Sequence, residues 1–361
     1  MSKSMIAKLP VARPRIAVLS FAHYHANFWT EAFLADPDVS VTCVWDDETA
    51  RGQEAADRFG IAFEPDLSAA LAGCDAVAIC SETARHPELT LAACAAGRAV
   101  LCEKPTARTV AEADAMAAAV GQAGILFMQS FPKRFDPASH ALKCLIDDGQ
   151  LGRVHLVRIR HGHFYGLQPE FRERWYVDPE LGGGGALLDE GIHGADLLHW
   201  LFGLPASVTA ETTSPVAGLA VDETATALFR YADGMMAELT ASFLLPAADT
   251  SVEIYGTRAT ALLSAVDLAS RDITREGFLR VSAEVAGKKR WKTLDVTPRF
   301  KLGQFHHQNA IGFVHCLRTG EPPPAGLAEG RAALLMIETA YAAARTGTRQ
   351  PIGPEPGDSR Q

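Results

Sequence analysis

The sequence predicts two domains: an N-terminal α/β Rossmann domain with a doubly wound parallel sheet, then a C-terminal α+β domain with a large, mostly antiparallel sheet. Its 361 residues are enough for two cores of ordinary size. The first part alternates short apolar strands with helices, which favours a parallel sheet. The later part has successive strands without helices between them, which favours antiparallel pairing. We expect residues 13–133 to form a nucleotide-binding domain and residues 134–361 a domain for substrate binding and oligomerisation.

The elements of the first domain follow from apolar runs and helix signals. Strands are expected over residues 15–19, 40–45, 75–80, 98–102 and 125–129. Helices are expected over about 25–35, 48–59 and 87–96. A further helix begins near Thr109, because Thr109 and Glu112 have the spacing of a capping box. This alternation predicts a Rossmann-like sheet.

The second domain is expected to begin at a helix that Asp136 caps and Pro137 opens, and that ends near residue 148. Extended stretches follow at 154–165, 207–213, 224–231, 235–243, 251–255, 259–264, 278–283 and 291–296. Asp233-Gly234 lies between two of them and is a hairpin signal. Two closing helices are expected over about 304–318 and 328–345.

Composition limits the class of protein. The net charge of −9 argues against nucleic acid and anionic membranes as partners, because binding phosphates requires clustered Lys and Arg. The sequence has no apolar run long enough to span a bilayer and no apolar leader segment at its start. Its seven cysteines are scattered, without a C-x-x-C pair, which favours reduced thiols. We therefore expect a cytoplasmic protein.

Ligands of parallel sheets bind at the carboxyl ends of the strands, and polar residues gather there. Where a glycine-rich phosphate loop would stand, the chain has Ser20-Phe21-Ala22-His23-Tyr24-His25. Ser20 and Ala22 are small enough for a pyrophosphate to approach, and His25 begins a helix where it could donate to an anion. The alternative is that this segment is an ordinary turn and that the protein binds a dinucleotide cofactor poorly.

Asp46 ends the second strand, where an acidic residue can accept a hydrogen bond from a ribose hydroxyl and repel a 2′-phosphate. This favours NAD as the cofactor, with NADP possible. Lys104 follows the fourth strand, between Glu103 and Pro105, and could donate to a substrate oxygen. The alternative for Lys104 is an ordinary surface lysine. His86 is either a residue of the nicotinamide pocket or a plain helix-start residue.

Four glycines at positions 182–185 lead into the most informative segment. We expect one amphipathic helix to carry Asp189 and His193 on the same face, because residues at i and i+4 are neighbours. A carboxylate beside an imidazole is suited to proton transfer. The alternative is a partly buried polar pair at a helix start.

Histidines of the second domain could serve a metal or a substrate. His161 and His163 alternate on a predicted strand and so face the same way, and His306 and His307 lie near the end of the chain. No carboxylate or cysteine completes a recognisable ligand spacing, so we predict no metal site. A substrate pocket lined by residues that precede the glycines is favoured instead, namely His163, Tyr165, Arg172 and Trp175.

Several motifs occur in order along the chain. They are Ala76-Val-Ala-Ile79 with His86, Ala99-Val-Leu-Cys-Glu103-Lys104-Pro105, Arg134-Phe-Asp-Pro137 with Gly149-Gln-Leu-Gly152, and Gly183 to Asp196. Together they resemble the glucose–fructose oxidoreductase/inositol dehydrogenase (Gfo/Idh/MocA) family. The resemblance implies NAD(P)-dependent hydride transfer at a carbinol or ketone carbon of a sugar, sugar derivative or cyclitol. It also implies a homodimer or homotetramer, and Lys104, Asp189 and His193 as catalytic residues.

The predicted site therefore has three parts. The cofactor residues are Ser20, Phe21, Ala22, His25, Asp46, Ser81, Glu82, His86, Glu103, Lys104 and Gln129. The substrate residues are Arg134, His163, Tyr165, Arg172, Trp175 and His307. In the mechanism, His193 takes a proton as hydride leaves the same carbon, Lys104 donates to the oxygen, and Asp189 orients the substrate or the histidine. Two alternatives are a redox-neutral glycoside-cleaving or epimerising enzyme that recycles its nucleotide, and a non-catalytic nucleotide-binding protein.

Overall fold

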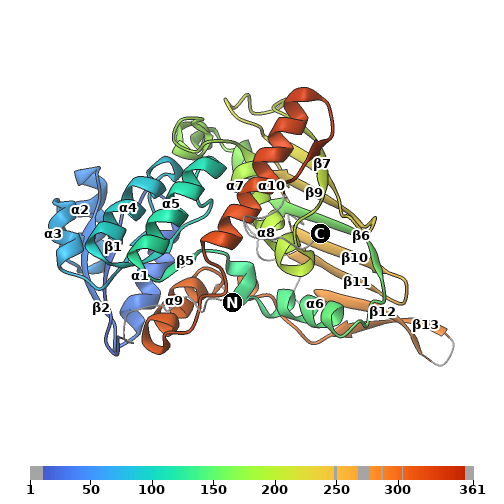
Figure 1. Cartoon of the computed structure of the whole chain (residues 1–361), viewed down its shortest axis with the longest axis horizontal. Helices are drawn as coiled ribbons and strands as arrows, with labels where there is room; N and C mark the ends of the chain where they lie inside the picture. Colours follow the sequence, from blue (N-terminus) through green and yellow to red (C-terminus); the bar gives the residue numbers. More distant parts are fainter. Residues whose placement is uncertain (1–10, 248–249, 267–276, 286–287, 303, 354–361) are drawn as a thin grey trace. The chain divides into compact units, whose positions relative to one another are not determined.

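The computed structural model describes residues 11–247, 250–266, 277–285, 288–302 and 304–353 (Figure 1). The chain forms two compact units. The first unit contains residues 1–132 and a returning segment, 306–331, and the second contains residues 133–305 and 332–361. The returning segment comes from a part of the chain that the sequence analysis assigned to the second domain. Each unit is described by itself below.

The first unit has a five-stranded sheet in the order β2-β1-β3-β4-β5. Its strands are β1 (Arg15–Leu19), β2 (Ser40–Trp45), β3 (Ala76–Ile79), β4 (Ala99–Cys102) and β5 (Phe127–Gln129). All neighbouring strands are parallel. Every residue of β3 and β4 is buried, as expected of central strands covered on both faces. The predicted Rossmann-like arrangement is confirmed.

Helices connect these strands. They are α1 (His25–Ala35), α2 (Thr49–Phe59), α3 (Leu67–Ala72), α4 (His86–Ala96), α5 (Val110–Ala123) and, from the returning segment, α9 (His307–Thr319). α1 packs against α9, and α4 packs against α5 (Figure 1). The Thr109 cap is confirmed, since its hydroxyl accepts from the Glu112 N–H. The sequence analysis missed α3, which Asp66 caps by accepting from the Ala69 N–H.

The second unit has a nine-stranded sheet in the order β13-β12-β11-β10-β6-β9-β8-β7-β14. Its strands are β6 (Val154–Gly162), β7 (Ser207–Thr213), β8 (Thr224–Arg230), β9 (Met236–Ser242), β10 (Thr250–Gly256), β11 (Thr260–Val266), β12 (Leu279–Val285), β13 (Lys288–Leu294) and β14 (Gln350–Pro351). All neighbours pair antiparallel except β6 and β9, which are parallel. The predicted mostly antiparallel sheet is confirmed. The Asp233-Gly234 turn joins β8 to β9, and Gly234 has φ +91°.

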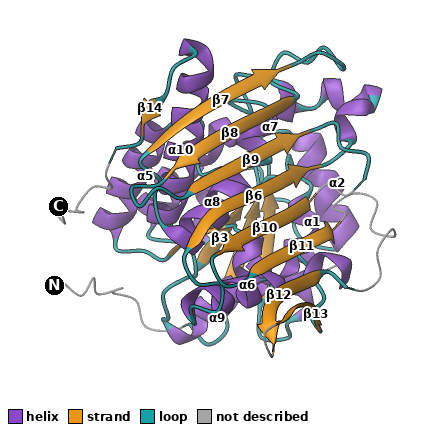
Figure 2. Ribbon diagram, turned by 90° about the vertical axis from the view of Figure 1, so that its right-hand side faces the viewer, coloured by secondary structure: helices purple, strands orange, loops and turns teal. Residues whose placement is uncertain are grey.

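The helices of the second unit are α6 (Pro137–Asp147), α7 (Ala186–Asp189), α8 (Gly191–Phe202) and most of α10 (Leu327–Thr346). α7 and α8 lie on one face of the sheet, against β6, β8 and β9. Figure 2 shows the opposite face, which no helix in the described part of this unit covers. That face carries partly exposed polar pairs such as Thr226 with Thr240 and Arg158 with Glu238. The sheet thus has one packed and one open face.

Two local differences from the predicted elements affect the site. The strand expected to run to residue 165 ends at Gly162, and three short 3-10 helices follow: Tyr165–Leu167, Pro169–Glu173 and Trp175–Val177. Phe171 and Val177 of this segment are buried against Phe243, so the segment folds back onto the unit as compact turns.

Among the residues that the structure describes, no helix is both long and apolar enough to cross a membrane.

Candidate functional site

The loop between β1 and α1 stands where a glycine-rich loop would hold a pyrophosphate. Ser20 has φ +72°, a left-handed conformation that glycine adopts without cost and other residues at about 1 kcal/mol or more. The Ser20 hydroxyl accepts from the Ala22 N–H (3.1 Å), which supports this conformation. The loop therefore has, at Ser20, a backbone conformation that glycine usually supplies. In this respect the residues present fit a dinucleotide.

Other donors of the same loop bond within the protein. The Phe21 N–H donates to Asp46 Oδ2 (2.8 Å), and the His23 N–H donates to the Cys80 carbonyl (2.9 Å). The His25 N–H donates to His23 Nδ1 (3.2 Å). A pyrophosphate at this loop would compete with those acceptors, so the loop differs chemically from a glycine-rich cradle.

Asp46 is buried and forms an ion pair that was not predicted from the sequence. The guanidinium of Arg51 donates to both Asp46 oxygens (2.9 and 2.7 Å) and also to Glu82 Oε1 (3.1 Å). Burial lowers the pKa of Arg51, but hydrogen bonds and charge from Asp46, with further charge from Glu82, raise it overall. Asp46 therefore does not present an isolated negative charge at the end of β2. The only sequence signal for this was that Arg51 follows Asp46 by five residues, near the start of the next helix.

Lys104 lies directly after β4 and is only 3% exposed, so it is not an ordinary surface lysine. Its backbone N–H donates to Glu103 Oε1 (3.0 Å). Gln129 holds the surrounding loop, because its side-chain Nε2 donates to the carbonyls of Cys102 and Glu103 (3.1 and 3.0 Å). Gln129 Oε1 in turn accepts from the Thr106 hydroxyl (2.7 Å).

His86, at the start of α4, has no exposed surface. Its ring nitrogens contact the carbonyls of Pro105 (2.8 Å) and Ser81 (3.3 Å). Burial lowers the pKa of His86, although these carbonyl contacts oppose the shift. Gln129 and His86 thus hold the loop of Lys104 in place, a positioning role that the sequence analysis did not foresee for either residue.

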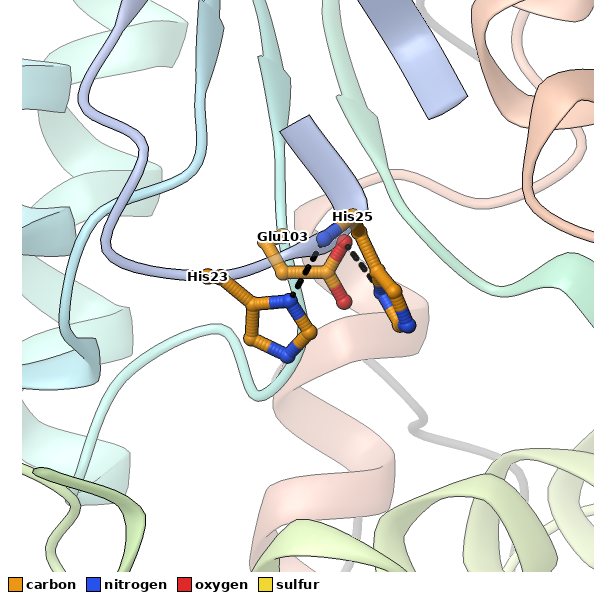
Figure 3. Close-up of side chains that lie close together, drawn as sticks. All are labelled: His23, His25 and Glu103. Carbon is orange, nitrogen blue, oxygen red and sulfur yellow. Dashed lines mark hydrogen bonds and ion pairs between the residues drawn. The ribbon is translucent and has the colours of Figure 1, made fainter. Parts of the chain in front are cut away.

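The two histidines of the β1–α1 loop face Glu103 (Figure 3). His25 Nδ1 lies 3.2 Å from Glu103 Oε2, and the His25 ring stacks on His306 with 3.5 Å between centroids. The side chain of His25, predicted to meet a bound anion, is therefore turned to a carboxylate. Burial lowers the pKa of His23 well below its ordinary value, and the neighbouring His25 lowers it further.

In the second unit, the glycine segment is closed by two side chains from distant parts of the sequence. Asp222 accepts from the N–H groups of Gly185 (3.0 Å) and Leu187 (2.8 Å), which begin α7. The Tyr341 hydroxyl donates to Asp222 Oδ1 (2.7 Å) and accepts from the Gly185 and Leu188 N–H groups (3.1 and 3.2 Å). A Cβ on Gly185 would lie 2.1 Å from the Asp222 carbonyl, which explains that glycine. Burial raises the pKa of Asp222, although its hydrogen bonds oppose the shift.

The helix that follows the glycines is not continuous, which corrects the predicted same-face arrangement. α7 ends at Asp189, Glu190 has φ −100°, and α8 begins at Gly191. Asp189 and His193 therefore lie on two helices, and helical i,i+4 spacing does not determine their relation. The capping network fixes the start of α7, and this helix ends after one turn. The leucines of the segment are buried: Leu187, Leu188, Leu197, Leu198 and Leu201.

Glu190, which the sequence analysis missed, is the centre of a buried polar cluster. His161 Nδ1 lies 2.8 Å from Glu190 Oε2, and His163 Nε2 lies 3.7 Å from Glu190 Oε1. The rings of His161 and His193 lie 4.8 Å apart. The expectation that His161 and His163 face the same way is confirmed, because both contact one carboxylate. Asp189 belongs to this cluster as well, since its carboxylate lies within 4.8 Å of ligand atoms of His163 and Glu190.

The remaining predicted substrate residues divide into two groups. Tyr165 lies beside His163, with ring centroids 4.7 Å apart, and the Trp175 ring lies tilted against Tyr176 (4.1 Å), whereas Arg172 is exposed. Arg134 forms a buried fork with Asp196 (2.8–3.1 Å), and its role as a substrate residue stays a prediction. His307 lies in the first unit, where Nε2 contacts Glu31 (3.2 Å).

Family models match both parts of the chain. Residues 16–131 match the model of the oxidoreductase family with an NAD-binding Rossmann fold, and residues 139–262 match the GFO/IDH/MocA C-terminal domain. The chain belongs to the GFO/IDH/MocA family. This confirms the predicted family, the predicted class of NAD-dependent oxidoreductase and the prediction of NAD as cofactor.

Curated relatives include oxidoreductases that are named for sugar substrates. The chain is 32% identical to 1,5-anhydro-D-fructose reductase of Ensifer adhaerens over 51% of its own length and 55% of the relative. It is 27% identical to D-apiose dehydrogenase of Paraburkholderia graminis, over 91% of the chain and 86% of the relative. The chain thus spans about half of the first relative and most of the second.

Solved structures share the fold at low sequence identity. A levoglucosan dehydrogenase in complex with NADH and L-sorbose has a TM-score of 0.83 and 22% identity. The alignment covers 94% of this chain and 99% of that one. The same arrangement of a Rossmann unit and a mostly antiparallel sheet is therefore present in both proteins.

Proposed function

We propose that this protein transfers a hydride between a nicotinamide cofactor and a carbinol or ketone carbon of a sugar, sugar derivative or cyclitol. The observation that carries the proposal is the buried cluster at the α7–α8 junction. There His193, Asp189 and Glu190 bring titratable groups together in the domain that the family model identifies as C-terminal. The substrate class is supported by the printed names of the relatives.

Each predicted residue has a chemical task in this proposal. The cofactor, when bound, supplies hydride acceptance or donation. His193 takes the proton from the substrate hydroxyl as a general base, and Asp189 orients it or the substrate. Lys104 donates a hydrogen bond to the same oxygen and stabilises the negative charge that develops there. The burial of Lys104 and His193, at 3% and 5% exposure, favours these tasks, because electrostatic interactions are stronger away from bulk water.

The cofactor and substrate are tested in two steps on the purified full chain. Thermal shifts are first compared for NAD, NADH, NADP and NADPH. Polyols and keto sugars are then screened with the nucleotide that stabilises most. Net reduction of nucleotide with a polyol supports the proposal. Product formation without net NADH release would instead indicate a recycled nucleotide, and binding without any turnover would indicate a non-catalytic protein.

Variants assign the catalytic residues. His193→Ala and Lys104→Met are each expected to lower turnover by about 100-fold or more, in the range usual for a lost general base or oxyanion donor. His315→Ala and Lys143→Met are matched controls, because both side chains form surface ion pairs, with Glu321 and Asp147. Near-normal turnover in either test variant would remove that residue from the mechanism.

A homodimer or homotetramer is also proposed. In the described residues of β8 and β9, the exposed apolar side chains Leu228 and Met236 alternate with buried residues and therefore lie on the open face of the nine-stranded sheet, among its polar pairs. Light scattering coupled to gel filtration measures the mass of the assembly. A mass equal to that of one 38.7 kDa chain at micromolar concentration would overturn the proposal.

A further inference from the structure

A histidine–carboxylate cluster in the first unit is independent of the groups assigned above to hydride transfer. It joins His23 and His25, from the loop after β1, to Glu103, which follows β4 (Figure 3). One ligand atom from each of the three side chains lies within 4.8 Å of the other two. All three residues are at most 3% exposed. We propose that His23, His25 and Glu103 bind one divalent transition-metal ion of the Zn²⁺ type.

The hydrogen bonds of the cluster show where electron pairs are directed. His23 Nδ1 accepts from the His25 N–H (3.2 Å), so this nitrogen carries a lone pair in the tautomer that makes the bond. His25 Nδ1 lies 3.2 Å from Glu103 Oε2. A metal ion bound here would take both atoms as ligands, with the imidazole nitrogen deprotonated. It would also take the His23 lone pair, in exchange for a long hydrogen bond.

The required movement is small. Zn²⁺ bonds of about 2.0–2.2 Å in tetrahedral geometry place ligand atoms about 3.4 Å apart. The ligand atoms here already lie within 4.8 Å of one another. Side-chain rotations that move each of them by roughly 1 Å would therefore bring all three to bonding distance of one ion.

Outer hydrogen bonds hold the carboxylate as they do around metal ligands. The Ser130 hydroxyl donates to Glu103 Oε2 (3.2 Å) and accepts from Asn309 Nδ2 (2.9 Å). The Lys104 N–H donates to Glu103 Oε1 (3.0 Å). The stacked ring of His306 fixes the plane of His25. Such partners orient ligands and strengthen metal binding.

The donor set selects the type of ion. Two imidazoles and one carboxylate suit Zn²⁺ and similar transition metals, whereas Ca²⁺ and Mg²⁺ prefer sites made of oxygen alone. Three protein ligands leave a fourth position for water or another oxygen ligand. The competing interpretation is a hydrogen-bonded pair of His25 and Glu103 that never takes up an ion.

The test measures metal binding without nucleotide or substrate, so its result is independent of the proposed hydride transfer. The full chain is stripped with EDTA, dialysed and titrated with Zn²⁺ by calorimetry, and its metal content is measured by mass spectrometry. Co²⁺ is added separately, because a tetrahedral Co²⁺ site absorbs in the visible range. His23→Gln and Glu103→Gln are compared with His315→Gln, a matched control whose imidazole is exposed and contacts Glu321.

We expect one bound Zn²⁺ per chain, a rise in melting temperature with Zn²⁺, and visible Co²⁺ bands. His23→Gln and Glu103→Gln should each weaken Zn²⁺ binding by at least about 100-fold, since each removes a ligand where loss of an outer partner alone costs 10–100-fold. His315→Gln should bind like the wild type. A stripped wild-type chain that takes up neither Zn²⁺ nor Co²⁺ would overturn the proposal without reference to any variant. Equal weakening by His315→Gln would do the same.

Discussion

Replacing Tyr341 with Phe tests how the glycine segment is held. The change removes only a hydroxyl, which donates to Asp222 Oδ1 (2.7 Å) and accepts from the Gly185 and Leu188 N–H groups (3.1 and 3.2 Å). The ring itself stays, so packing is conserved. The perturbation therefore isolates the polar cap of α7.

The expected loss follows from the bonds removed. A typical internal hydrogen bond contributes about 1 kcal/mol, and a bond to a charged group about 1.5–3 kcal/mol. Asp222 still accepts from the Gly185 and Leu187 N–H groups, and the Leu188 N–H still donates to the Gly185 carbonyl (3.0 Å), so the change removes the bonds of the hydroxyl without leaving any of these groups unpaired. We expect Tyr341→Phe to reduce the free energy of unfolding of this segment by about 2–3 kcal/mol.

The assay is amide hydrogen exchange of peptides that cover residues 182–191, with urea unfolding of the whole chain beside it. Faster exchange by about 30–160-fold corresponds to the expected loss. Tyr255→Phe is the control, because its hydroxyl contacts Glu253 at the partly exposed sheet surface (2.7 Å). Exchange in Tyr341→Phe that matches Tyr255→Phe within about threefold would refute the capping argument.

Three further predictions concern other parts of the site. Arg51→Ala should weaken the thermal stabilisation by NADPH more than that by NADH, because the guanidinium of Arg51, which comes from α2 and lies beside Asp46, can accommodate a 2′-phosphate that Asp46 alone would repel; equal losses would contradict this. Glu190→Gln should lower the free energy of unfolding by about 1–2 kcal/mol, since the buried His161 loses a charged acceptor, whereas Glu253→Gln at the surface should change it by less than about 0.5 kcal/mol. Burial lowers the pKa of His86 in the folded state. Below about pH 6.5 the unfolded chain therefore binds a proton that the folded chain excludes. The free energy of unfolding then decreases as the pH is lowered, by at most about 1.4 kcal/mol per pH unit. Urea unfolding between pH 7 and pH 5 measures this slope, and His86→Gln should reduce it by up to one proton; an unchanged slope would show that His86 does not contribute.

Local sequence signals predicted most elements of the first unit. β1 and α1 lie where the apolar run and the following helix pattern placed them, and the Thr109 cap forms as predicted. These signals succeed because burial of a short apolar strand and satisfaction of a helix start depend on neighbours in the sequence. The capping of α7 was not predictable in the same way. It depends on Asp222 and Tyr341, which follow the glycines by more than thirty and more than one hundred and fifty residues.

The sequence by itself determined the order of strands and helices, the family, and the individual residue types that the proposed chemistry needs. Periodicity, caps and glycines are local, and a motif is read without knowing its surroundings. Only the tertiary structure decided the partners of those residues: Arg51 on Asp46, Glu190 on His161, and His23 with His25 on Glu103. Charge and hydrogen-bonding groups act over a few ångströms in space, and the chain brings such groups together only when its sheets have formed.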